Sequence, residues 1–149
     1  MDLIRERMLM TKKASDADMK RWKKVKVFED LAQESSVTFD EPYTELLIIS
    51  ENLRGENGSQ LIKYLNNKMI CGQNGDISST TGYNCVDFIE CITDGYIKNV
   101  HLQKQQYQIS TLSINTYGLM NIGISEITSL KLSPQYKTFI SGKATVYAR

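Results

Sequence analysis

The sequence predicts an α+β fold, in which a C-terminal antiparallel β-meander packs against two or three helices and a basic N-terminal arm comes first. Three observations predict it. Asp40-Glu41-Pro42 is a helix-start signal, because a carboxylate caps the first turn and proline fits there. Apolar residues then recur at helical spacing in three stretches, at 43–53, 61–70 and 85–92, all before Asp94. Beyond that residue they alternate with polar ones, as they do in half-buried strands.

The length of 149 residues, with 41% hydrophobic side chains, favours one domain with its own core. We expect residues 1–22 to be a basic flexible arm and residues 23–149 to be a single α+β domain. Short alternating stretches at 25–27 and 37–39 indicate two strands ahead of the helices.

The first helix is expected to follow Pro42, with Tyr43 on its apolar face, and to end near Arg54-Gly55. A second helix is expected from Ser59 to Ile70. Residues 72–84 read as a loop, because glycine, asparagine, serine and threonine dominate there.

A short third helix is expected to start with Asn84 as its cap and to close at Asp94-Gly95. Four strands of the meander then follow, over residues 96–102, 106–115, 119–132 and 136–147.

Charge is concentrated at the N-terminus. Residues 1–26 hold nine basic and four acidic side chains, whereas the rest of the chain is acidic on balance. This asymmetry is typical of a chain that contacts a polyanion or an anionic membrane. The alternative is a solvated basic linker in which Trp22 anchors the arm to the domain. The candidate residues for binding a membrane or phosphate are Arg5, Arg7, Lys12, Lys13, Lys20, Arg21, Trp22, Lys23, Lys24 and Lys26.

Chemistry-bearing residues are few. The single histidine, His101, could act as a general base for Cys85 or Cys91 in a minimal thiol enzyme, but a strand histidine at the surface explains it more simply. Three cysteines without a Cys-x-x-Cys pair predict reduced thiols and no zinc site. We therefore expect no catalytic residues, no cofactor, no metal and no small-molecule substrate.

Two further patterns in the sequence are typical of binding sites. Tyr43 and Leu46 match the short Tyr-x-x-Leu motif that adaptor proteins bind, although a pair of core residues on a helix accounts for them better. Tyr107, Tyr117 and Lys131 lie on the expected sheet, where aromatic and basic side chains could bind single-stranded RNA. A small nucleic-acid-binding module is therefore the first alternative to an assembly protein.

No apolar stretch is long enough to span a bilayer, and no secretory signal is visible, so we expect an intracellular protein that is not secreted. The basic arm and the lack of a reaction centre favour a structural protein that self-associates. Its expected partners are further copies of itself, an anionic membrane surface, and a nucleocapsid or RNA.

One family shares this order of features. A lysine-rich arm leads into a strand, and Phe39-Asp-Glu-Pro-Tyr43 opens a helix that ends at Leu53. A second helix follows, and a Ser141–Val146 strand closes the β-rich half. In this order the chain resembles the matrix proteins of rhabdoviruses, over residues 20–147. The resemblance implies a non-enzymatic protein that self-associates and links a nucleocapsid to the envelope. It also implies a place in the virion, in the host cytoplasm and at the inner face of the membrane. The chain departs from that family in lacking a Pro-Pro-x-Tyr motif.

Overall fold

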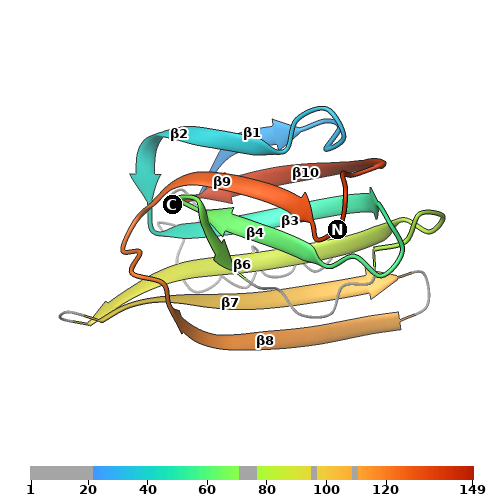
Figure 1. Cartoon of the computed structure of the whole chain (residues 1–149). Helices are drawn as coiled ribbons and strands as arrows, with labels where there is room; N and C mark the ends of the chain where they lie inside the picture. The colour runs from blue at the N-terminus through green and yellow to red at the C-terminus, as the bar shows by residue number, and fades with distance from the viewer. Residues whose placement is uncertain (1–21, 71–76, 95–96, 109–110) are drawn as a thin grey trace.

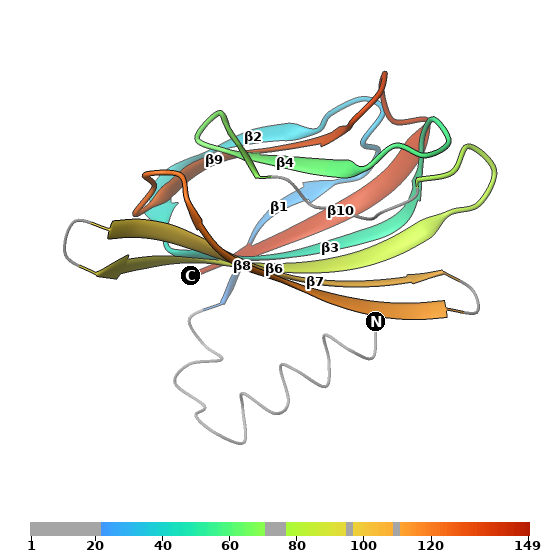
Figure 2. The ribbon, with the colours of Figure 1, turned by 60° about the horizontal axis from the view of Figure 1, so that its bottom comes forward.

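A computed structural model describes residues 22–70, 77–94, 97–108 and 111–149, and from 93 to 121 it describes the backbone alone. The described residues form ten strands in two antiparallel sheets and contain no helix. The expected α+β fold is therefore wrong, because the segments predicted as helices are strands. Figures 1 and 2 show the two sheets as stacked layers.

The larger sheet has six strands in the order β1-β10-β3-β6-β7-β8. Its strands β6, β7 and β8 follow one another as a meander (Figure 1). The bounds are Lys23–Phe28 for β1, Ser141–Ala148 for β10, Glu45–Arg54 for β3, Tyr83–Asp94 for β6, Ile97–Gln108 for β7 and Thr111–Asn121 for β8.

The smaller sheet has four strands in the order β2-β9-β4-β5. Side chains from the facing sides of the two sheets meet between them and form the main core, which includes Phe28, Leu46, Leu65, Leu132 and Val146. This is the arrangement of a β-sandwich. The bounds are Ser36–Tyr43 for β2, Ile127–Pro134 for β9, Leu61–Leu65 for β4 and Lys68–Ile70 for β5.

The segment expected as the first helix forms the end of β2 and all of β3. Pro42 lies where the register between β2 and β9 is irregular, as suits a proline in an edge strand. In β3 the run Leu46-Leu47-Ile48-Ile49 is buried on both sides of the sheet. A strand buried on both faces loses its alternation and cannot be distinguished from a buried helix by periodicity.

The segment expected as the second helix is the β4–β5 hairpin. Leu61, Lys63 and Leu65 point into the core, so the inward positions do alternate, but a lysine among them conceals the pattern. Asn66 and Asn67 have φ angles of 51° and 64°. Positive φ at both central residues is the requirement of the type I′ turn that joins tight hairpins. The strand partners Leu65 and Lys68 flank this turn.

The segment expected as the third helix is β6. Cys85 and Ile89 face the main core, whereas Phe88 belongs to a second cluster on the opposite side of the sheet. The supposed cap Asn84 instead accepts a hydrogen bond, at 2.9 Å, from the backbone N–H of Asn52. Asn52 has a positive φ and sits at an irregularity in the register between β3 and β6. Asn84 therefore stabilises a strand bulge.

The expected loop over 72–84 is only partly a loop. Residues 71–76 lie outside the described part of the chain, but Ile77 pairs with Ser59 and is fully buried, as is Tyr83. The expectation of a loop throughout 72–84 is therefore wrong at Ile77 and Tyr83.

The four expected C-terminal strands are present with different bounds and a different connection. Residues 119–132, expected as one strand, contain the end of β8, a link with Gly123 at a φ of 70°, and most of β9. β9 joins the smaller sheet, and β10 returns to lie between β1 and β3 (Figure 1). The meander therefore ends at β8.

Candidate functional site

Of the basic candidate residues, the structure describes three lysines, Lys23, Lys24 and Lys26. All three lie on β1, at one edge of the larger sheet. Lys23 Nζ lies 2.9 Å from Glu41 Oε1, and Lys26 Nζ lies 2.7 Å from Glu34 Oε1, while Lys24 is exposed. Hydrogen bonding and attraction to Lys23 lower the pKa of Glu41, and the same contact raises the pKa of Lys23. Two of these three cations are therefore neutralised by acids of the same chain.

Trp22 is held against the body of the domain. Its ring meets Phe88 edge-on at a centroid distance of 6.2 Å, and the Arg149 guanidinium lies 4.4 Å from the Trp22 ring centroid. Arg149 in turn forms an ion pair with Glu45. Trp22 is therefore in contact with β6 and with the C-terminal residue of the domain. The other basic candidates, Arg5, Arg7, Lys12, Lys13, Lys20 and Arg21, lie outside the described residues.

An apolar cluster occupies the outer face of the larger sheet. Leu47, Ile49, Val86 and Phe88 are buried there, and Trp22 and Tyr147 pack against them. The outer face of a sandwich is ordinarily polar, so this cluster marks a covered surface. Sequence reasoning missed it, although the uninterrupted Leu-Leu-Ile-Ile run was the available sign.

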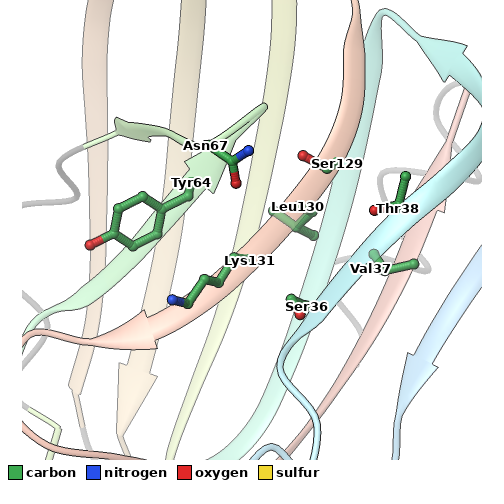
Figure 3. A pocket seen from close by; sticks show the side chains of 8 residues that line it. All are labelled: Ser36, Val37, Thr38, Tyr64, Asn67, Ser129, Leu130 and Lys131. Atoms are coloured by element: carbon green, nitrogen blue, oxygen red, sulfur yellow. The ribbon is translucent and has the colours of Figure 1, made fainter.

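A groove of about 360 Å³ opens on the outer face of the smaller sheet (Figure 3). Lys131 extends from β9 toward Tyr64 of β4, with its Nζ 5.4 Å from the ring centroid. The lining supplies hydroxyls, an amide and one ammonium, which are groups that bind polar molecules. It contains no carboxylate, imidazole or thiol. The lining residues are Ser36, Val37, Thr38, Tyr64, Asn67, Ser129, Leu130 and Lys131.

The two described cysteines have settings that disfavour a nucleophile. Cys85 is buried, and its Sγ donates to Asp87 Oδ2 at 3.1 Å. Burial, with a smaller contribution from the charge of Glu126, raises the pKa of Cys91 to about 11. A raised pKa leaves little thiolate at neutral pH. His101 lies in β7 with Glu90 as its strand partner, and its side chain is outside the description.

The two residues of the possible adaptor motif, Tyr43 and Leu46, differ in how deeply they are buried. Leu46 is fully buried in the core, and Tyr43 packs against that core at the end of β2. Burial raises the pKa of Tyr43, as do the nearby carboxylates of Glu41 and Asp40. A partner that binds both side chains would have to unfold the start of β3.

Comparison of the chain with protein-family models, curated proteins and solved structures finds no match. In the part that the structure describes, no helix is long and apolar enough to cross a membrane. No three of the described His, Cys, Asp and Glu side chains gather as metal ligands do. The function must therefore be argued from the surfaces of the sandwich.

The two edges of the larger sheet differ sharply in charge. β1 carries three lysines in six residues, which is a common protection of an edge strand against pairing with another chain. β8, at the other edge, has eleven residues without a single charge or proline. Among the described strands, β7 is its only neighbour in the sheet. Such an edge is a template for strand addition.

Proposed function

We propose that this chain is a non-enzymatic structural protein that self-associates and uses its basic N-terminal segment to contact an anionic surface. The observation that carries the proposal is the long uncharged edge at β8, opposite a lysine-rich edge at β1. Two copies that join through their β8 edges would extend the larger sheet across the interface. The occupant of this edge is thus a second copy of the chain.

The basic segment supports the second half of the proposal. Residues 1–21 hold six basic side chains and enter the domain at Trp22, beside the outer apolar cluster. Each cation near an anionic leaflet contributes about 1 kcal/mol of attraction. The expected partners remain an anionic membrane and a nucleocapsid. The resemblance to rhabdovirus matrix proteins included two helices that are strands here, so the edge strands and the charge carry the proposal in its place.

Self-association is tested by light scattering over a range of concentrations. The wild-type mass should rise with concentration. Thr116→Lys, which places a charge in the middle of β8, should hold the protein near the mass of one chain. Thr38→Lys adds the same charge to the edge strand β2 of the other sheet and should behave as the wild type does. A wild-type mass that stays monomeric at all concentrations would overturn the proposal.

Contact with an anionic surface is tested by co-sedimentation with phosphatidylserine vesicles. Replacing Lys12 and Lys13 by Gln should reduce binding about tenfold or more, because two charges are lost. The matched control replaces Lys137 and Lys143 by Gln. These two lysines are exposed on the domain, and their replacement should change binding little. Deletions should stop at residue 21, since removing residues 1–26 would also remove most of β1. Equal effects of the two double variants would contradict an arm-based contact, and binding to RNA but not to vesicles would favour the nucleic-acid alternative.

A further inference from the structure

One ion pair lies completely inside the sandwich. Lys63 projects from β4 of the smaller sheet and Asp87 from β6 of the larger sheet, and both side chains are 0% exposed. Lys63 Nζ lies 2.9 Å from Asp87 Oδ1. Taking two opposite charges out of water carries a large desolvation penalty. A chemical change that removes both charges would therefore relieve this penalty. Nothing in the proposed function uses this pair.

We propose that Lys63 and Asp87 condense to an intramolecular amide, an isopeptide bond that joins the two sheets covalently. This inference is independent of the assembly proposal, because it concerns only the interior of one chain. The site is a self-modification site, and its reactants are the two side chains themselves.

The surroundings of the pair suit this reaction. The strand partners of Lys63 are Leu132 and Ile70, and Asp87 is paired with Ile48 in β3. On its other side Asp87 is paired with Lys104 of β7. Both side chains of the buried pair are 0% exposed, and this burial keeps out the water that the reverse reaction requires.

Each atom of the condensation can be followed. The ammonium of Lys63 passes one proton to Asp87 Oδ1, which leaves a neutral amine and a carboxylic acid. The nitrogen lone pair attacks Cγ and forms the C–N bond. A second proton moves from nitrogen to Oδ1, the C–O bond breaks, and Oδ1 leaves as water. The product is a neutral amide, nothing is oxidised or reduced, and no co-reactant is needed.

Two features of the geometry promote attack at Cγ. Strands of two packed sheets hold the amine against the carboxyl group, and fixed pairs of this kind reach effective concentrations of about 10⁵–10⁸ M. The Cys85 thiol donates to Asp87 Oδ2 at 3.1 Å. A donor on that oxygen withdraws electron density from Cγ and stabilises the charge that develops there. Because Oδ1 leaves as water, Oδ2 is the oxygen that the amide retains.

The test is the mass of the intact full-length chain, measured after unfolding in denaturant. We expect the purified protein to be lighter than its sequence mass by one water molecule. Proteolysis should then yield a branched peptide that joins the segments holding Lys63 and Asp87. A chain with its full sequence mass after prolonged incubation in the folded state would overturn the proposal, and this result does not depend on any variant folding.

Two other reactions would cause the same mass loss: an amide between Asp87 and Lys104, and a succinimide at Asp94-Gly95. Each can be distinguished from the proposed bond. Lys104 is the strand partner of Asp87 on β7, so Lys104→Met serves as the matched control for Lys63→Met. The loss should persist in Lys104→Met and vanish in Lys63→Met. A succinimide at Asp94-Gly95 also removes one water, but it would persist in Lys63→Met and be cleaved by hydroxylamine. A loss that survives Lys63→Met, or a branch that maps to Lys104, would overturn the assignment.

Discussion

Gly142 has a backbone conformation and a neighbourhood that both exclude a side chain. Its φ is 145°, and a Cβ there would lie 2.7 Å from Leu53 Cδ2 and 3.2 Å from Leu53 Cα. Leu53 is fully buried, so it has little room to move. We expect Gly142→Ala to lower the free energy of unfolding by about 2–4 kcal/mol, as measured by urea denaturation.

Gly58 provides the matched control for Gly142. Its φ is also positive, at 77°, but a Cβ there would meet nothing within 4 Å. Gly58→Ala should therefore lose only about 1 kcal/mol through backbone strain. Equal losses in the two variants would show that the contact with Leu53 is unimportant.

Cys91 should react slowly with alkylating reagents. Its pKa of about 11, against an ordinary 9.0, leaves about 100-fold less thiolate at neutral pH. We expect its modification by iodoacetamide at pH 7, followed by mass spectrometry, to be about 100-fold slower in the folded chain than in denaturant. Equal rates in the two states would contradict the raised pKa and revive the thiol-enzyme alternative.

The same thiol links stability to pH. The folded state keeps the Cys91 proton up to about pH 11, whereas the unfolded thiol loses it near pH 9. The unfolded state then binds fewer protons, so this thiol contributes a loss of stability as the pH rises from 9 to 11. The loss should be smaller in Cys91→Ala.

The β4–β5 hairpin depends on the side chain of Asn66. Its Nδ2 donates to the Glu126 carbonyl at 2.8 Å, and its Oδ1 accepts from the backbone N–H groups of Thr128 and Ser129. Asn66 therefore ties the turn to the start of β9. We expect Asn66→Ala to lower the free energy of unfolding by about 2–3 kcal/mol in denaturant titrations, because the N–H groups lose their acceptor.

Asn67, the second residue of the turn, is the control for Asn66. Its φ of 64° suits glycine, which is the residue favoured at that position of a type I′ turn. Asn67→Gly should change stability by less than about 1 kcal/mol. A similar loss in both variants would mean that the hydrogen bonds of the Asn66 side chain do not account for its effect.

The strands that were wrongly predicted as helices are those in which the alternation of apolar and polar residues is interrupted. Lys63 and Asp87 occupy inward positions of β4 and β6, where a polar residue breaks the alternation that indicates a strand. Leu47 and Ile49 fill the outward positions of β3 and remove its alternation altogether. Both deviations arise from tertiary contacts, an inter-sheet pair and a covered outer face, and local patterns carry no information about such contacts. The C-terminal strands keep alternating stretches in the sequence and were recognisable by their period.

The candidate surfaces were only partly predictable for the same reason. The basic cluster was visible in the sequence, but its pairing with Glu34 and Glu41 required the folded register. The uncharged composition of β8 was equally visible. Its meaning came only from the order of strands, which places β8 at an edge and β1 at the opposite edge.

Assembly and surface contact should be coupled in the whole molecule. A single basic arm binds weakly, whereas several arms on one assembled sheet bind together, and linked sites gain about 10²–10⁴ in overall affinity. Thr116→Lys should therefore weaken binding to phosphatidylserine vesicles by about 100-fold, as measured by co-sedimentation at the wild-type concentration. The added lysine by itself would strengthen attraction to the vesicles, so a loss reports assembly and not charge. Thr38→Lys, with the same charge on β2, should bind as well as the wild type or slightly better. Undiminished vesicle binding by a monomeric Thr116→Lys would separate the two activities and show that the arm acts without the assembled sheet.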